Sequence, residues 1–206
     1  MQKSYVRWAL FYAVTPLLII SCAGSGKVAK QVEKSQATQS QVEEPAIPDS
    51  ARQQYDDAIE AMKSGNIGQA KNILSNLVKS YPDLAGPYVN LGIIHFRADE
   101  IDEAENAFRQ ALKVNPDNAV SLNHLGIINR GKGKFEEARD NYEKALDIDP
   151  NYAYAHLNYG ILLDLYLGEL ENALAHYQKF QQLTPEEDKE VTKWIVDLER
   201  RIERAN

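Results

Sequence analysis

The sequence predicts an all-α protein, a solenoid of four helix-turn-helix repeats followed by a C-terminal capping helix. From residue 51 onward the chain repeats at a step of 34 residues, and two segments with helical periodicity fit into each copy. Prolines and small residues recur at this step, as expected where helices end and where they cross closely. They are Pro82, Pro116 and Pro150, with Ala58, Gly92, Gly126 and Gly160, and with Ala70, Ala104, Ala138 and, after one inserted residue, Ala173.

Composition narrows the classes of function. The chain has 206 residues, 44% of them hydrophobic, and a net charge of −7. An acidic chain is a poor ligand for nucleic-acid phosphates, so we expect no nucleic-acid partner. Its one cysteine can form no internal disulfide and cannot supply the paired thiolates of a structural zinc site.

The first segment, residues 1–21, has the organisation of a secretory signal. Lys3 and Arg7 make a basic start, and an apolar run of 13 residues follows from Trp8 to Ile20. As a helix this run would reach about 20 Å, short of the roughly 30 Å hydrocarbon layer of a membrane. The segment therefore reads as a cleaved signal peptide and not as a transmembrane span.

The end of this signal, Ile19-Ile20-Ser21-Cys22, resembles the lipobox of bacterial lipoproteins. The resemblance implies that Cys22 becomes the mature N-terminus, carrying a thioether-linked diacylglycerol and an amide-linked acyl chain such as palmitate. Several acyl chains hold a protein on a membrane lastingly, where one gives marginal binding. Ala23 follows in place of an aspartate, which the same resemblance associates with the outer membrane, facing the periplasm. An unmodified cysteine is the alternative.

Residues 22–50 are expected to be the lipidated cysteine and a flexible linker. The stretch after Cys22 is rich in Ser, Gln, Ala, Lys and Glu and contains no aromatic residue, so it has little apolar surface to offset the entropy of ordering. As a coil it would span roughly 30 Å. The alternative is that Val28, Val32 and Val42 dock on the folded body.

The repeats themselves resemble the tetratricopeptide repeat, most closely in the second copy, 85–118, and the third, 119–152. The matching residues of the second copy are Tyr88, Leu91, Gly92, Ala104, Phe108, Ala111 and Pro116, and those of the third are Leu122, Leu125, Gly126, Ala138, Tyr142, Ala145 and Pro150. Gly65, Gly133 and Gly168 mark turns between the paired helices.

The outer copies depart from this pattern, as terminal repeats do. In the degenerate first copy, 51–84, Asp57 replaces an apolar residue; in the fourth, 153–185, Phe180 replaces a small one and an extra residue in LGEL should alter the turn. Capping boxes are predicted at Ser50 and at Thr184. The last segment, 186–206, should be a helix that covers the fourth repeat with Val191, Trp194, Ile195, Leu198 and Ile202.

A binding surface is predicted on the first helix of each copy. Positions 5, 9 and 12 of that helix lie roughly 120° from the stripe that meets the second helix. In tetratricopeptide repeats these positions line a concave groove that binds extended peptides or helices. The predicted apolar lining is Tyr55, Ile59, Met62, Val89, Ile93, Phe96, Val120, Ile127, Leu157 and Ile161, with Leu165 beyond, and the polar rim is Asn90, Arg97, Asn123, His124, Arg130, Asn158 and Asp164. The alternative is that part of this stripe packs between neighbouring first helices.

The sequence gives little support to a catalytic or metal-binding function. The four histidines fall at different repeat positions with no i, i+4 pair, and no GxSxG motif or phosphate-binding loop is present. We therefore expect a protein that is not an enzyme and that needs no metal or cofactor. The carboxylate clamp known in the family is also unexpected, because its Lys and Asn positions hold Val89 with Ile93, or Asn123 with Ile127.

The predicted function is that of a lipid-anchored periplasmic adaptor that binds a peptide or helix of an envelope protein. The chain is similar to outer-membrane tetratricopeptide lipoproteins, of which some, pilotin-like, assist pilus assembly by escorting the secretin. The resemblance favours a secretin or pilus component as partner, in pilus or secretion-complex assembly. The alternatives are an adaptor for peptidoglycan-remodelling enzymes and a homo-oligomeric structural lipoprotein whose groove is filled by a second copy.

Overall fold

The computed structural model describes residues 47–205, and all regular structure within them is helical. The prediction of an all-α solenoid of paired helices is confirmed. The paired helices are α1 (Asp49–Lys63) and α2 (Ile67–Ser80), α3 (Ala85–Arg97) and α4 (Ile101–Val114), α5 (Ala119–Gly131) and α6 (Phe135–Ile148), and α7 (Ala153–Leu162) and α8 (Leu170–Leu183), with a π-helical turn, η1 (Leu163–Leu167), after α7 and the final helix α9 (Lys189–Ala205).

The predicted signal peptide, Cys22 and the linker up to residue 46 lie outside the described residues. Pro45–Asn206 forms one compact unit with its own hydrophobic core. Among the described helices, none has the length and apolar character needed to cross a membrane.

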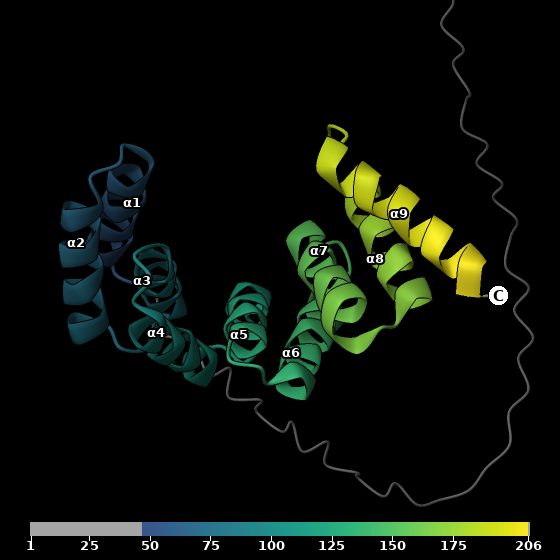
Figure 1. The fold of residues 1–206 in the computed structure, drawn as a ribbon. Coiled ribbons are helices and arrows are strands. Elements are labelled where there is room, and N and C mark those ends of the chain that lie inside the picture. Colours follow the sequence, from purple (N-terminus) through teal and green to yellow (C-terminus); the bar gives the residue numbers. More distant parts are fainter. Residues whose placement is uncertain (1–46, 206) are drawn as a thin grey trace, which may run out of the picture. The chain divides into compact units, whose positions relative to one another are not determined.

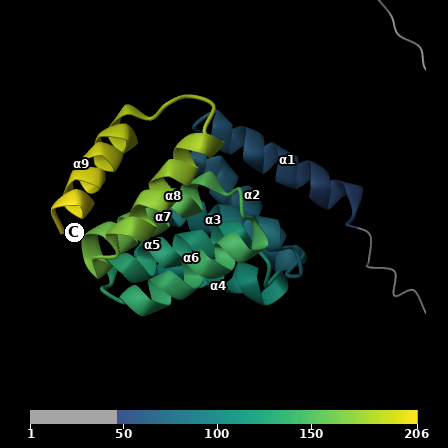
Figure 2. The same ribbon diagram turned by 90° about the vertical axis from the view of Figure 1, so that its right-hand side faces the viewer.

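The helices form a curved stack with an inner and an outer row. The inner row consists of the first helices α1, α3, α5 and α7, and the outer row of α2, α4, α6 and α8 (Figure 1). Each second helix also packs on the first helix of the next pair, and α9 packs on α8 in the same way. A view from the C-terminal end shows α9 beside α8, joined to it by a loop (Figure 2).

The turns inside the pairs use left-handed backbone, where a side chain is usually disfavoured. Gly65, Gly133 and Gly168 have φ of 76°, 73° and 69°, as their spacing in the sequence predicts. The second pair places Asp99, at φ 60°, in the equivalent position. Aspartate tolerates this conformation better than most residues, so the missing glycine leaves the turn intact.

The recurring glycines inside the first helices lie under aromatic rings of the second helices. A Cβ added to Gly92 would come within 2.6 Å of Phe108, and one added to Gly126 within 2.5 Å of Tyr142. Phe108 and Tyr142 are fully buried at these crossings. The close approach of each pair of helices therefore requires a residue without a side chain.

The inserted residue of the fourth repeat lies before the turn and not within it. The turn residue Gly168 keeps the left-handed conformation of the other repeats. The extra residue is absorbed by η1, a wider π turn that continues α7. The expectation that the LGEL insertion alters the turn is therefore wrong, because a π turn accommodates one residue at a small local cost.

Both predicted capping boxes are also wrong. Helix α1 begins two residues earlier than predicted, at Asp49, so Ser50 lies within its first turn, and no side chain caps it. At α9 the Asp188 carboxylate accepts hydrogen bonds from the backbone N–H groups of Glu190 (2.9 Å) and Val191 (3.2 Å). The Thr184 hydroxyl instead donates to the carbonyl of Phe180, at the end of α8.

Helix α9 covers the end of the fourth pair, as its apolar stripe predicts. Val191 and Leu198 are buried, and Ile195 and Ile202 pack against the same core cluster as Tyr177. Trp194 departs from the prediction, since 39% of its surface remains exposed. Its ring lies beside that of Tyr177, with centroids 5.6 Å apart.

Candidate partner-binding face

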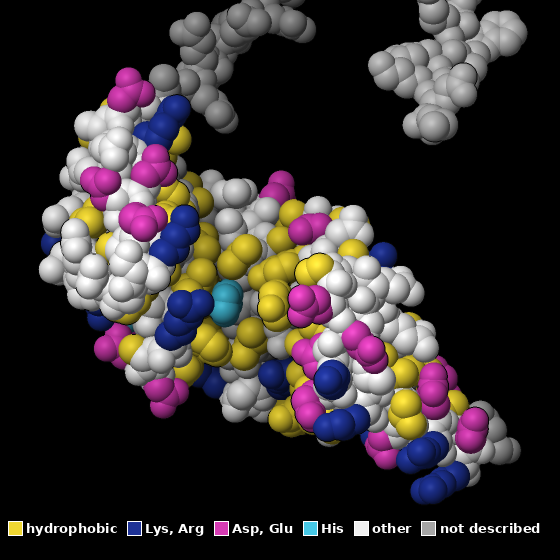
Figure 3. All heavy atoms as spheres, turned by 90° about the horizontal axis from the view of Figure 1, so that it is seen from above, with side chains coloured by type: hydrophobic (Ala, Val, Ile, Leu, Met, Phe, Trp, Pro, Cys, Tyr) yellow, Lys and Arg dark blue, Asp and Glu magenta, His cyan; other side chains and the backbone are white. Residues whose placement is uncertain are grey.

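A row of isoleucines follows the inner side of the stack. Ile59, Ile93, Ile127 and Ile161 occupy the same position in the four first helices, and each is half-buried. Figure 3 shows the inner side of the stack as a hollowed surface with apolar side chains gathered over its floor and Lys and Arg side chains along part of its margin. We call this surface the concave face.

The predicted groove residues differ in exposure. Val89 and Asn123 are buried, with 7% and 2% of their surface exposed, so they support the face from beneath. Arg97 is exposed. The half-buried members are Tyr55, Ile59, Met62, Asn90, Ile93, Phe96, Val120, His124, Ile127, Arg130, Leu157, Asn158 and Ile161.

Polar groups predicted for the rim form links between neighbouring first helices. The Asn90 amide donates to the Tyr55 hydroxyl at 2.7 Å, joining α3 to α1. The Asn158 amide donates to the Asn123 side-chain oxygen at 3.0 Å, joining α7 to α5, and Arg130 donates to the Asn158 carbonyl at 3.2 Å. These groups are therefore hydrogen-bonded within the fold and link neighbouring first helices to each other.

His124 lies among aromatic rings of the second and third pairs. Its ring stacks on Phe108, with centroids 4.7 Å apart, and meets the edge of Phe96 at 5.4 Å. Its Nδ1 atom is buried without a hydrogen-bond partner. Burial, and then the nearby charge of Arg97, lower the pKa of His124 to about 4, so the imidazole is neutral at pH 7.

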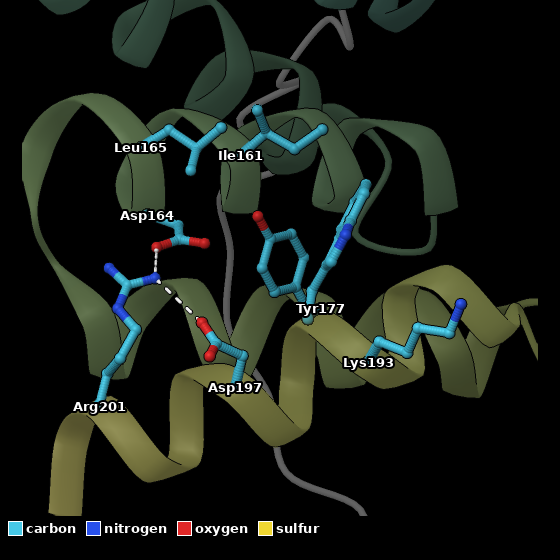
Figure 4. Close-up of a pocket in the computed structure, with 8 residues that line it drawn as sticks. Ile161, Asp164, Leu165, Tyr177, Lys193, Asp197 and Arg201 are labelled. Carbon is cyan, nitrogen blue, oxygen red and sulfur yellow. Dashed lines mark hydrogen bonds and ion pairs between the residues drawn. The ribbon is translucent and has the colours of Figure 1, made fainter.

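A cavity of about 460 Å³ opens where the concave face meets α9. Ile161, Leu165, Tyr177 and Trp194 give it an apolar lining, and Lys193 also borders it. Asp164, predicted for the polar rim, is nearly buried here and accepts a hydrogen bond from Arg201 of α9 at 2.7 Å. Figure 4 shows Asp164, Arg201 and Asp197 grouped at one end, Tyr177 in the middle and Lys193 toward the other end. We call this cavity the α9 slot.

The floor of the α9 slot is aromatic and uncharged at neutral pH. Burial, together with the neighbouring Asp164 carboxylate, raises the pKa of the Tyr177 phenol. The Arg201 guanidinium also lies 3.8 Å from Asp197, a surface carboxylate one turn earlier in α9. The charges of Asp164 and Arg201 therefore compensate each other at the slot.

A contact between two histidines was also not predicted. The Nδ1 atoms of His156 in α7 and His176 in α8 lie 2.9 Å apart, and the Nε2 atom of His156 lies 3.1 Å from the Pro150 carbonyl. The two histidines are 20 residues apart, so no helical spacing signals the pair. Within residues 47–205, no group of three or more His, Cys, Asp or Glu side chains is placed to hold a metal ion.

Stacked helical hairpins with an apolar inner face define a repeat protein of the kind that binds other proteins. Tetratricopeptide-repeat family models match residues 83–151 and 130–188, together just over half of the chain. The chain belongs to the tetratricopeptide-repeat family. Members of this family mediate protein–protein interactions, and their repeats are typically non-catalytic scaffolds. No protein of curated function matches the sequence in a direct comparison.

Solved structures share the fold at low sequence identity. PilF of Pseudomonas aeruginosa has a TM-score of 0.65 and 23% identity, over 76% of this chain and 71% of that one. MamA of Desulfovibrio magneticus RS-1 has a TM-score of 0.63 and 19% identity, over 77% and 88%. The first repeat domain of Spaghetti (RPAP3), solved with a bound HSP90 peptide, has a TM-score of 0.53 and 21% identity, over 57% and 92%.

Proposed function

We propose that this chain is a lipid-anchored adaptor on the periplasmic side of the outer membrane, whose concave face binds a peptide or helix of an envelope protein. Binding to other proteins is the general role of tetratricopeptide repeats. The anchor and the location rest on the resemblance of Ile19-Ile20-Ser21-Cys22 to a lipobox. In this role the linker would let the body capture a partner near the membrane surface.

The row of four isoleucines carries this proposal. Ile59, Ile93, Ile127 and Ile161 give the concave face a continuous apolar strip, and each keeps part of its surface exposed. Contiguous apolar surface rimmed by polar groups is typical of sites that bind other proteins. A partner with apolar side chains at regular intervals would bury this strip.

Pilus or secretion-complex assembly is the process we favour. The combination of lipobox and repeats resembles the pilotin-like lipoproteins, and PilF of Pseudomonas aeruginosa shares the fold of the repeats. The partner would then be a secretin or another pilus component. A cell-wall enzyme and a second copy of this chain are the competing partners.

Photo-crosslinking in cells tests the adaptor role. We would place p-benzoylphenylalanine at Ile127 on the concave face, with Lys144, exposed on the outer helix α6, as the matched control. The proposal expects adducts with a secretin or pilus protein from position 127 and none from 144. Adducts with a cell-wall enzyme would favour an adaptor for peptidoglycan-remodelling enzymes. Adducts only with the chain itself would indicate an oligomer contact.

The anchor is tested separately by the Cys22→Ser variant. We expect this variant to fold but to leave the membrane fraction or to accumulate as the uncleaved precursor, because the lipid-bearing thiol is gone. Fractionation and intact-mass measurement distinguish these forms. Mature, membrane-bound protein in the variant would refute lipidation. The crosslinking experiment would still test partner binding by the concave face.

A further inference from the structure

The α9 slot arises from a difference in packing along the inner row. Helix α3 packs against α5 and α5 against α7, whereas α9 packs on α8 and not closely on α7. The space between α7 and α9 is bridged at one end by the ion pair of Asp164 and Arg201. The whole slot, with Asp164 and Arg201 at that end, has a volume of about 460 Å³.

The surfaces that remain free in the slot are apolar. Trp194 is 39% exposed and Leu165 is 66% exposed. The charged groups at its border have partners. Asp164 pairs with Arg201, and Lys193 pairs with Glu190 at 2.6 Å. A side chain that entered the slot would therefore meet an indole, a phenol and aliphatic carbons, which suit an aromatic ring.

The charge of the concave face indicates which residues the rest of such a ligand should carry. Arg97 is exposed near the floor of the second pair, close enough to lower the pKa of His124. Arg130 lies at the end of α5, with its Nη1 donating only to a backbone carbonyl. In a chain of net charge −7, these cations make the middle of the face locally basic, which favours an acidic residue in the ligand.

We propose that the α9 slot binds an aromatic side chain of the segment held on the concave face, and that this segment carries acidic residues opposite Arg97. The inference rests on the proposed adaptor role and specifies the chemistry of the partner. Neighbouring helices pack at roughly 10 Å, so α3 and α7, which borders the slot, are about 20 Å apart, a distance that an extended chain covers in about six residues. The ligand is therefore an acidic segment with an aromatic residue near one end.

Synthetic peptides test this specificity on residues 45–206. The probe is an amidated, fluorescein-labelled peptide of two glutamates, a Gly-Ser-Gly-Ser spacer and one phenylalanine, made in both sequence directions. Fluorescence anisotropy should show saturable binding of at least one direction. Replacing its phenylalanine with alanine should weaken binding at least tenfold. Equal binding of the alanine peptide, or no binding in either direction, would overturn the proposal.

Variants locate the binding. Leu165→Lys and Trp194→Ala change exposed side chains of the slot, and each should weaken binding of the phenylalanine peptide at least tenfold. Val196→Lys changes an equally exposed residue of α9 that does not line the slot, and should bind as the wild type does. Unchanged binding by both slot variants would refute the slot as the site. Sedimentation of the same proteins decides whether a second copy occupies it, since a dimer that Leu165→Lys disperses would also overturn the proposal.

Photo-crosslinking in cells from position 127, repeated with the slot variants, distinguishes failure of the slot from failure of the adaptor role. If Leu165→Lys removes the envelope adduct formed from position 127 and Val196→Lys keeps it, both proposals stand. If the envelope adduct persists with Leu165→Lys, the adaptor role stands and the slot is refuted. Peptide binding in the slot without any envelope adduct would instead refute the adaptor role alone.

Discussion

At the scale of single residues, the glycines of the first helices are the most constrained positions in the fold. In an exposed helix, glycine to alanine is stabilising by up to about 1 kcal/mol. Gly126 reverses this preference because a Cβ would meet the Tyr142 ring at 2.5 Å. Tyr142 is fully buried, so its ring can move aside only by disturbing the core.

We therefore predict that Gly126→Ala lowers the free energy of unfolding by about 1–3 kcal/mol. Gly131→Ala is the matched control, since Gly131 lies in the same helix and a Cβ there would meet nothing within 4 Å. The control should be neutral or slightly stabilising. Urea unfolding of residues 45–206 measures both, and equal stability of the two variants would show that the ring adapts freely.

His124 gives the folded state a dependence on pH. Its pKa is about 4 in the fold and about 6.5 when unfolded, so the unfolded chain binds more protons between these values. The stabilisation is present above pH 6.5 and is lost as the pH falls toward 4. We predict that His124→Phe, which keeps a ring between Phe96 and Phe108, gains about 1–2 kcal/mol over the wild type at pH 5 and much less at pH 7.5.

Urea unfolding of both proteins at the two pH values measures this difference. His156 and His176, whose pKa values burial also lowers, to about 4 for His176, remain in both proteins and cancel in the comparison. Parallel pH dependence of the wild type and His124→Phe would contradict the assignment. The burial of His124 was not predicted, because its contacts with Phe96 and Phe108 come from two other helices.

At the scale of elements, helix pairing could be predicted from the sequence, and the caps that begin α1 and α9 could not. The period and the glycines determine which helices meet, because each crossing repeats the same contact. Helix ends depend on single side chains that compete for the same backbone groups. Asp188, for example, accepts the first free N–H groups of α9 while Thr184 closes α8. The π turn η1 lies at Leu163–Leu167, earlier in the chain than the LGEL segment in which the insertion was predicted to act.

The attachment of α9 offers a prediction at this scale. Arg201→Gln removes the cation from Asp164, whose side chain is 8% exposed, and should lower the free energy of unfolding by about 1–2 kcal/mol. Asp197→Asn is the control, since Asp197 is 68% exposed and lies 3.8 Å from the same arginine. Its effect should stay within about 0.5 kcal/mol. Similar losses from both variants would mean that the pair of Arg201 with Asp197 stabilises α9 as much as its pair with Asp164 does.

At the scale of the whole molecule, the concave face follows from the repeat and the α9 slot does not. Periodicity places Ile59, Ile93, Ile127 and Ile161 on one side of the stack wherever the repeats are regular. The slot depends on the place where regularity ends, at η1 and α9, where no further repeat determines the packing. Within the repeats, Val89 and Asn123 are buried, and the sequence could not indicate which members of the predicted groove would be covered.

A stack in which each pair contacts mainly its neighbours should lose stability locally when its end is removed. Ending the chain at residue 186 removes α9 and uncovers Tyr177 and Phe180, which Val191 and Leu198 help to bury. We predict that amides of α7 and α8 then lose most of their hydrogen-exchange protection, while those of α3 and α4 keep theirs. The control, Glu199→Ala with Arg200→Ala, changes two exposed residues of α9 and should leave protection unchanged. Equal loss of protection across α3 to α8 would instead show that the stack unfolds as one cooperative unit, in which α9 stabilises every repeat.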